Sequence, residues 1–186
     1  MRTNALRIRR AADCLHRGGI LAYPTEAVWG LGCDPFDREV VLRLLQIKNR
    51  QAEKGMILIA ASMQQLGALL EPLDDGQRKQ LAATWPGPVT WLLPDPQELI
   101  PWWIKGDHAT VAVRVSAHPV VQALSLAFSG PLVSTSANIA GRRPATSRLQ
   151  LVKQLGASVD HILNGPLGGH GAPSVIRDLT SGMRLR

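Results

Sequence analysis

Apolar residues recur along the chain with two periods, one helical and one extended. Apolar side chains three or four positions apart predict helices, and this spacing occurs in residues 4–17, 37–48, 62–70, 77–84, 118–128 and 147–155. Short apolar runs are typical of buried strands. They occur in residues 20–23, 56–60, 89–93, 111–115, 132–133 leading into 134–136, 162–163 and 175–176. Interleaved elements of this kind predict one α/β domain over residues 1–186, with a mixed sheet flanked by helices.

Polar residues and glycines mark the ends of several of these elements. Asn4 and Asp37 stand where a helix needs a side chain that accepts a hydrogen bond from its first free N–H groups. Gly18 and Gly19 follow the first helical pattern and are typical of a helix end. The boundaries of the first two helices are therefore predicted from the sequence.

Composition limits the classes of protein that remain. The chain has 186 residues, 45% of them hydrophobic, which is enough for one substantial core. No apolar run approaches the roughly 20 residues of a membrane span, and Cys14 and Cys33 belong to no CxxC pair or Cys/His cluster. We therefore expect no membrane association, no zinc site and no disulfide, and a cytoplasmic location. A net charge of +7 favours anionic partners, although a merely soluble basic surface is the alternative.

The first chemically informative segment follows the strand at residues 20–23. The chain continues with a proline, Thr25, Glu26 and the glycines Gly30 and Gly32. A strand that ends this way presents polar groups to a ligand and lets backbone come close to it, whereas an ordinary turn is the plainer interpretation. For Glu26, the sequence offers no physical reason to prefer a catalytic role over a role in loop structure.

Three later segments repeat the pattern of polar groups beside an apolar strand. Lys48, Arg50 and Lys54 could clamp a triphosphate, or could simply complement the dipole at a helix end. The alternating strand at residues 110–114 points Thr110 and Arg114 to one face, where the arginine could clamp a carboxylate or remain solvated. The run STSAN at residues 134–138 is dense enough in hydroxyls to bind an anion or nucleotide, or to form a plain turn.

Several familiar catalytic patterns are absent from the sequence. There is no GxxxxGK[ST], no GxGxxG, no GxSxG and no paired carboxylates. We therefore expect catalysis by positioning and electrostatics, without a covalent intermediate.

Six ordered motifs resemble those of the YrdC/TsaC family. They are YPTEAVWGLG, K-x-R at Lys48 and Arg50, WPGPVT at residues 85–90, AVRV at 112–115, STSAN at 134–138 and APS at 172–174. The resemblance covers residues 12–178. It implies the short, single-domain form of a threonylcarbamoyl-AMP synthase, with a twisted mixed sheet and a basic concave site.

The resemblance implies a nucleotidyltransferase that makes threonylcarbamoyl-AMP and pyrophosphate from L-threonine, bicarbonate and ATP. The product would serve N6-threonylcarbamoylation of adenosine 37 in tRNAs that read ANN codons, through a TsaB/TsaD/TsaE-type transferase complex. It assigns Lys48 and Arg50 to catalysis, with Lys54 as a helper. The residues implied to bind ATP are Lys48, Arg50, Thr110, Ser136 and Asn138. Those implied to bind threonine are Thr25, Arg114, Ser134 and Ser174. Mg²⁺ is expected to arrive on the ATP phosphates, with no metal site in the protein.

The chain departs from the commoner family pattern at a few positions, and two rival functions remain. Gln51 and Ser116 stand where proline is frequent, Gly55-Met56 replaces Pro-Leu, and Val175 replaces threonine. None of these changes removes a charged group assigned above. One rival is a module that binds tRNA or double-stranded RNA, weakly or as its main task, and the other is a carbamoyl-AMP-forming relative.

Overall fold

The computed structural model describes residues 4–169, 171–172 and 174–185. Its α-helices are α1 (Ala5–His16), α2 (Arg38–Lys48), α3 (Gly67–Leu70), α4 (Asp75–Thr84), α5 (Trp102–Lys105), α6 (Pro119–Phe128) and α7 (Arg148–Leu155). Two short 3₁₀ helices are η1 (Ala52–Lys54) and η2 (Met63–Leu66). The strands are β1 (Leu21–Pro24), β2 (Trp29–Gly32), β3 (Ile57–Ala60), β4 (Val89–Pro94), β5 (Thr110–Val115), β6 (Leu132–Ser136), β7 (His161–Ile162) and β8 (Val175–Asp178).

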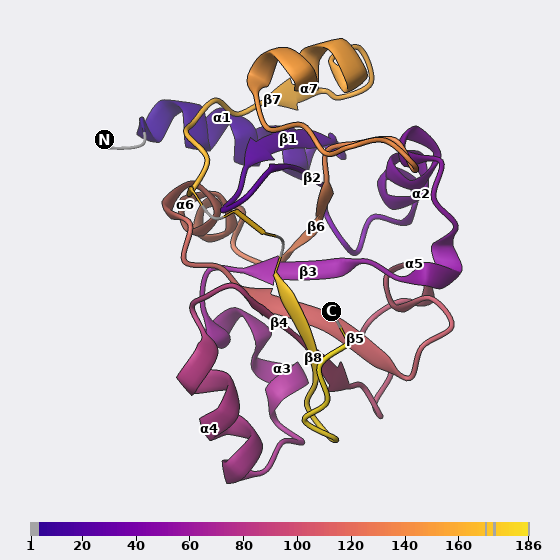
Figure 1. Cartoon of the computed structure of the whole chain (residues 1–186), viewed down its shortest axis with the longest axis vertical. Helices are drawn as coiled ribbons and strands as arrows, with labels where there is room; N and C mark the ends of the chain where they lie inside the picture. The colour runs from indigo at the N-terminus through magenta and orange to yellow at the C-terminus, as the bar shows by residue number, and fades with distance from the viewer. Residues whose placement is uncertain (1–3, 170, 173, 186) are drawn as a thin grey trace.

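The eight strands form one mixed sheet in the order β7-β1-β2-β6-β3-β5-β4-β8 (Figure 1). Strand β6 joins the two halves because it pairs with β3 through its first residues and with β2 through its last. Three pairs are parallel: β1 with β7, β3 with β5, and β4 with β8. The predicted α/β fold with a mixed sheet flanked by helices is confirmed.

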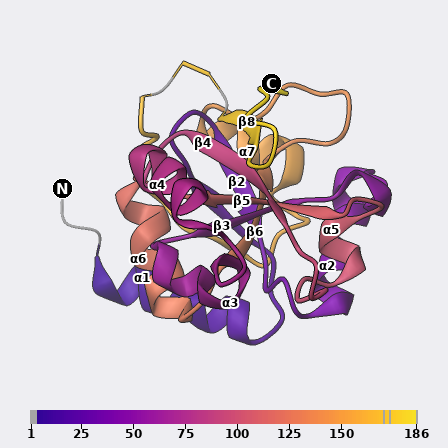
Figure 2. The same cartoon turned by 90° about the horizontal axis from the view of Figure 1, so that it is seen from below.

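Helices cover the two halves of the sheet separately. Helices α1 and α6 lie side by side over the half that contains β1, while α3 and α4 lie against the half made by β3, β5 and β4 (Figures 1 and 2). The side chains of Leu58, Val113 and Leu93 pack with leucines from α3 and α4 in the larger of two apolar clusters. Among the described residues, no helix covers the opposite face of this half-sheet in the same way (Figure 2), and a cavity lies there.

Local chemistry explains the helix boundaries. Asn4 Oδ1 accepts a hydrogen bond from the N–H of Leu6, and Asp37 Oδ1 accepts from Glu39 and Val40, as predicted. Helix α4 begins at Asp75, two residues before the predicted start, because Asp74 and Gln77 form a reciprocal capping box.

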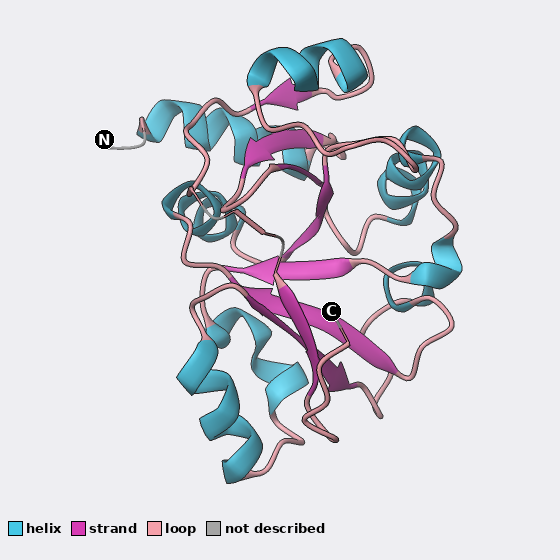
Figure 3. Cartoon of the chain, viewed as in Figure 1, coloured by secondary structure: helices cyan, strands magenta, loops and turns pink. Residues whose placement is uncertain are grey.

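The sequence interpretation was wrong about the segment that follows β1. Residues 29–32, expected as part of a glycine-rich turn, form strand β2 antiparallel to β1 and β6 (Figure 3). A Cβ at Gly32 would lie 2.5 Å from the carbonyl oxygen of Val133, so glycine lets β2 approach its neighbour. The predicted helix over residues 62–70 divides into η2 and α3, and helix α5 was not predicted.

Candidate functional site

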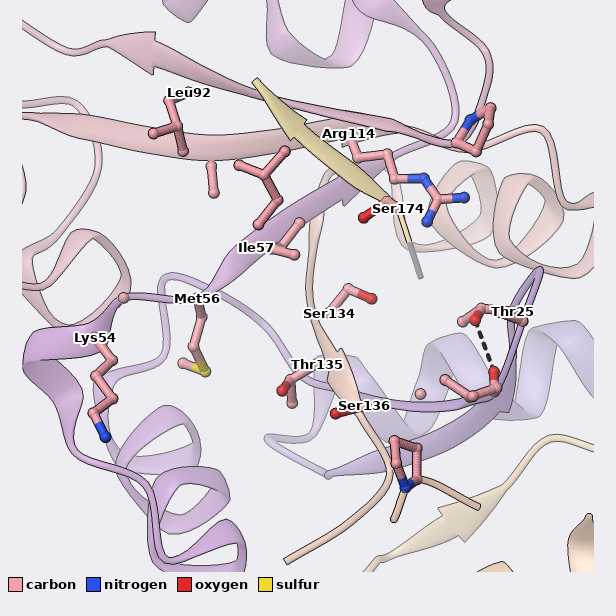
Figure 4. A pocket seen from close by; sticks show the side chains of 18 of the residues that line it. Thr25, Lys54, Met56, Ile57, Leu92, Arg114, Ser134, Thr135, Ser136 and Ser174 are labelled. Atoms are coloured by element: carbon pink, nitrogen blue, oxygen red, sulfur yellow. Dashed lines mark hydrogen bonds between the residues drawn. The ribbon is translucent and has the colours of Figure 1, made fainter. Parts of the chain in front are cut away.

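A cavity of about 520 Å³ opens on the uncovered face of the half-sheet, a size within the roughly 300–1,000 Å³ of small-molecule sites. Its floor is formed by residues that lie side by side in register on β3, β5 and β4, namely Ile57, Ala112 and Leu92. The end of β6 and the β1–β2 turn form one wall, and β8 forms another (Figure 4). Strands from distant parts of the sequence therefore converge on one pocket.

Hydroxyl groups line one side of this cavity. Ser134 and Ser136 alternate along β6, so their side chains share a face, and Thr25 and Ser174 approach from neighbouring segments (Figure 4). The hydroxyl of Thr25 donates to the carbonyl oxygen of Val28 at 2.7 Å, which closes the β1–β2 turn. Ser174 Oγ lies 2.9 Å from the hydroxyl oxygen of Thr90 on β4. Hydroxyls can both donate and accept, so this wall suits a polar ligand.

Arg114 reaches the cavity from β5 and forms a buried ion pair. Its Nη2 contacts Glu26 Oε1, and its Nε donates to the carbonyl oxygen of Gly87 at 3.0 Å. Burial alone would raise the pKa of Glu26. The charge of Arg114 and a hydrogen bond from Ser116 outweigh burial, so the pKa is lowered and the carboxylate is ionised. Thr110, Ala112 and Arg114 all line the cavity, as the alternation of the strand predicted.

Two further cations lie across the cavity from Thr25. Arg50 and Lys54 line the end formed by η1, and Lys54 is opposite the hydroxyl wall in Figure 4. The Nη2 of Arg50 donates to the carbonyl oxygen of Gly55 at 2.8 Å, which fixes the guanidinium beside β3. Burial lowers the pKa of Arg50, but from a value so high that the group stays charged. Lys105 also lines this region.

Lys48 lies behind the hydroxyl wall and is not among the lining residues. Its side chain is buried, and Nζ donates to the carbonyl oxygens of Ser136 and, at 2.9 Å, Asn138. Burial, with a smaller effect from the charge of Arg50, lowers the pKa of Lys48 to about 8. The ammonium group therefore secures the turn after β6 and places a positive charge directly behind Ser136.

Asn138 also acts within this turn. Its Oδ1 accepts a hydrogen bond from the hydroxyl of Ser136 at 2.6 Å. Its Nδ2 donates to the carbonyl oxygens of Ile139 at 3.0 Å and Arg142 at 2.8 Å. Asn138 does not line the cavity. It orients Ser136 and closes the loop that follows.

The structure brings seven of the nine predicted site residues into the cavity lining. These are Thr25, Arg50, Thr110, Arg114, Ser134, Ser136 and Ser174. Lys48 and Asn138 lie immediately behind them, joined to Ser136. The individual roles assigned to all nine residues stay predictions.

Glu26 is the residue that sequence reasoning left without a role. It lines the cavity although it is only 6% exposed. The sequence signal was one carboxylate between an apolar strand and an apolar, glycine-containing segment. That signal could not identify Arg114 as its partner, because Glu26 lies in the β1–β2 turn and Arg114 lies on β5, far along the chain.

The acidic groups of the described residues do not form a metal site. Across residues 4–169, 171–172 and 174–185, no three His, Cys, Asp or Glu side chains gather as metal ligands. Both cysteines are buried and free. Within these ranges, the structure also contains no helix with the length and apolarity needed to traverse a bilayer.

Comparison with known proteins gives consistent results over nearly the whole chain. Residues 13–186 match the Sua5_yciO_yrdC family model, described as "Telomere recombination". The chain is 50% identical to the threonylcarbamoyl-AMP synthase of Marinobacter nauticus over 97% of its length and 95% of the relative's. It is 52% identical to the enzyme of that name from Pseudomonas savastanoi, covering 97% of this chain and 96% of the relative.

Solved structures show the same fold. P. abyssi Sua5 in complex with L-threonine superposes with a TM-score of 0.90 at 33% identity. The match covers 97% of this chain and 53% of Sua5, so the chain spans about half of that longer protein. E. coli YciO, with a TM-score of 0.79 and 23% identity over 94% of this chain and 84% of its own, shares the fold.

Proposed function

The chain belongs to the Sua5/YciO/YrdC family, and we propose that its cavity catalyses the synthesis of threonylcarbamoyl-AMP. One observation carries this proposal: the β6 hydroxyls lie between Arg114, suited to a carboxylate, and Lys54 in Figure 4. Arg50 contacts Gly55, beside Lys54, and both cations suit phosphates. An amino acid and a nucleoside triphosphate are substrates of complementary chemistry for these two ends. The activity is that of a nucleotidyltransferase acting on threonine and ATP.

The reaction needs no covalent enzyme intermediate. The neutral threonine amine attacks carbon dioxide derived from bicarbonate and releases one proton to solvent, which gives a carbamate. An oxygen of the carbamate then attacks the α-phosphorus of ATP. The bond from this phosphorus to the bridging oxygen breaks, and pyrophosphate leaves. Since negative charge builds on the phosphoryl group and the leaving group, the cations at this end stabilise the transition state.

We assign the threonine carboxylate to Arg114. Its Nε and Nη2 contact Gly87 and Glu26, which leaves Nη1 and the second hydrogen of Nη2 as donors for the substrate. Thr25, Ser134 and Ser174 complete the amino-acid end with hydroxyl groups. The bound threonine thereby has its carboxylate and its polar side chain recognised separately.

We assign the ATP phosphates to Arg50, with Lys54 assisting and Thr110 and Ser136 as neutral donors. Lys48 and Asn138 support this end by fixing Ser136 and the turn after it. Glu26 is the one acidic side chain among the described lining residues, and it is paired. Mg²⁺ would therefore be held chiefly by the ATP phosphates, and it would neutralise the charge of the leaving pyrophosphate.

In this account the product passes in the cytoplasm to a TsaB/TsaD/TsaE-type transferase, which modifies tRNA. An RNA-binding module is the less favoured function, because the described lining of the cavity contains no Phe or Tyr and a single Trp, Trp29, which is buried. Two measurements distinguish the synthase from an RNA-binding module. One is threonine-dependent pyrophosphate release, and the other is filter binding of tRNA and double-stranded RNA across salt concentrations. Tight RNA binding without such release would refute the synthase assignment.

Valine, which replaces the hydroxyl of threonine with a methyl group, should be a very poor substrate. A site that hydrogen-bonds a substrate hydroxyl rejects the analogue lacking it by about 10⁴-fold, because its buried polar groups lose their partners. We expect kcat/KM for valine to be lower by at least about 10³-fold in a pyrophosphate-release assay. Comparable kcat/KM values for threonine and valine would show that the hydroxyl wall does not recognise the hydroxyl group of the substrate side chain.

The kcat/KM for ATP at saturating threonine should fall as the pH rises through about 8, the pKa of Lys48. Only the protonated amine places a positive charge behind Ser136 and makes charge-assisted hydrogen bonds to both carbonyl oxygens. Under these conditions kcat/KM for ATP reports the enzyme form that has not yet bound ATP. The effect on stability has the opposite sign: the pKa is lowered from 10.5, so the unfolded chain binds more protons between about 8 and 10.5. The contribution of Lys48 to stability therefore rises with pH across this window.

Lys48→Arg supplies the check on this pH dependence, because arginine stays protonated at these pH values. The alkaline fall in kcat/KM should move to higher pH in this variant. A fall that stays at the same pH would assign it to another group.

A further inference from the structure

Glu26 is a buried carboxylate to which the proposed reaction gives no task. It follows β1 in the β1–β2 turn, and its Oε1 contacts Nη2 of Arg114. The same oxygen accepts a hydrogen bond from the hydroxyl of Ser116 at 2.6 Å. Burying an ionised carboxylate is costly unless it is paired, so this arrangement requires both partners.

Ser116 is itself fixed on every polar atom. Its N–H donates to the carbonyl oxygen of Ala60 at 3.1 Å, and its own carbonyl oxygen accepts from Gln122 Nε2 at 3.0 Å. Its hydroxyl oxygen accepts from the N–H of His118 at 3.0 Å, which directs the hydroxyl hydrogen toward Glu26. Ser116 stands where the family pattern has proline, which has no hydroxyl to donate. In this chain, the connection between β5 and α6 therefore anchors the carboxylate.

The guanidinium of Arg114 is held at two of its nitrogens by two distant segments. Nε donates to the carbonyl oxygen of Gly87, and the N–H of Gly87 donates to the carbonyl oxygen of Val115 at 2.9 Å. Nη2 is held by Glu26 from the β1–β2 turn. Because the group is planar, contacts at Nε and Nη2 together define both its position and the direction in which its other donors point.

The loop at residue 168 closes this arrangement from outside. The N–H of Gly168 donates to the carbonyl oxygen of Thr25 at 3.0 Å. A Cβ at Gly168 would lie 2.9 Å from Cα of Glu26 and 3.1 Å from Cδ2 of His118. The loop therefore packs directly on Glu26, which is only 6% exposed.

We propose that Glu26, anchored by Ser116, is a positioning residue that holds the Arg114 guanidinium in the orientation that receives the threonine carboxylate. This inference rests on the proposed function of Arg114. The arginine is ordered before the substrate arrives, so threonine binding does not have to restrict a long, flexible side chain. Glu26 acts through Arg114 and does not touch the reacting atoms.

Steady-state kinetics of Glu26→Gln, Glu26→Ala and Ser116→Ala test the proposal. We expect Glu26→Ala to raise the threonine KM by about tenfold or more, with the KM for ATP and kcat changed less than about twofold. Glu26→Gln keeps an acceptor for Nη2 and should have a smaller effect, as should Ser116→Ala, which removes only the anchor. An unchanged threonine KM in all three variants, or a fall in kcat alone, would overturn the proposal.

Asp95→Asn is the matched control. Asp95 is also a buried carboxylate: its Oδ2 lies 3.5 Å from Lys105 Nζ, and it accepts from the N–H groups of Leu99 and Ile100. Removing the charge of this carboxylate in Asp95→Asn should lower the melting temperature, as we also expect for the Glu26 variants. The threonine KM of Asp95→Asn should stay unchanged. An equal rise in the threonine KM in this control would attribute the effect to general destabilisation and overturn the proposal. If Glu26→Ala does not fold, Glu26→Gln and Ser116→Ala carry the test.

A measurement without substrate separates this inference from the proposed function. In protein labelled with ¹⁵N-arginine, restricted rotation should give Arg114 separate Nη1 and Nη2 signals, assigned by their loss in Arg114→Lys. These signals should average in Glu26→Ala and persist in Asp95→Asn. Averaged signals in the unmodified protein, or separate signals in Glu26→Ala, would overturn the positioning role even if threonine is the substrate. Absence of threonine-dependent pyrophosphate release would instead refute the proposed function and leave this result intact.

Discussion

Replacing Arg114 with alanine is expected to raise the threonine KM by about 10²-fold while changing the KM for ATP by less than about threefold. The guanidinium is the cation that we assign to the amino-acid end of the cavity, and truncating one partner of a buried charged hydrogen bond costs about 2–5 kcal/mol of binding. Initial rates of pyrophosphate release at saturating ATP, with threonine varied, measure the effect. Equal changes in the two KM values would refute the carboxylate assignment.

Arg114→Ala should also destabilise the fold, and this effect has its own control. Removing the arginine leaves Glu26 buried without its cation, which lowers the free energy of unfolding by about 3–5 kcal/mol. The double variant Arg114→Ala/Glu26→Gln should recover part of that loss in urea unfolding, since no uncompensated charge remains. Its threonine KM should stay high. A double variant that regains threonine affinity would show that the loss in Arg114→Ala came from misfolding.

Replacing Lys48 with methionine is expected to lower the rate of the chemical step by about 10²–10³-fold, the usual effect of removing a preorganised electrostatic contact. Methionine is of similar length but cannot donate to the carbonyl oxygens of Ser136 and Asn138. The variant therefore loses the positive charge behind the hydroxyl wall and the bonds that hold the turn. Single-turnover measurements with saturating ATP and threonine separate this rate from binding.

Lys54→Ala is the comparison for Lys48→Met. Lys54 lines the same end of the cavity but its side chain is exposed, so its charge is screened by solvent. We expect a loss of about tenfold or less for this variant. A larger loss in Lys54→Ala than in Lys48→Met would reverse the ranking of the two lysines.

Much of the fold could be predicted because its signals are local. The side chains of Asn4 and Asp37 accept hydrogen bonds from N–H groups two or three residues further along the chain. The starts of both helices could therefore be predicted from the sequence. The alternation at Thr110, Ala112 and Arg114 placed three side chains on one face of β5, and all three line the cavity. A pattern that acts within a few residues can be read without knowing the tertiary structure.

The remaining features depend on contacts between distant segments. Strand β2 contains two glycines and is stabilised by pairing with β6, which lies a hundred residues further along the chain. Lys48 is buried behind Ser136 and does not line the cavity. A lysine at the end of a helix is usually exposed, so the sequence pattern does not predict this position. The Glu26–Arg114 pair joins the β1–β2 turn to β5, which is a neighbour of neither β1 nor β2 in the sheet. Local pattern carries no information about such pairings.

Incorporation of radiolabelled bicarbonate is the most direct test of whether the protein synthesises threonylcarbamoyl-AMP. The protein is incubated with ATP, Mg²⁺, labelled bicarbonate and each amino acid in turn, and the nucleotide products are separated. The account predicts that label enters an AMP adduct with threonine, in parallel with pyrophosphate release, and does so far less with valine. Label that enters an AMP adduct without any amino acid, or no labelled adduct with threonine, would contradict it.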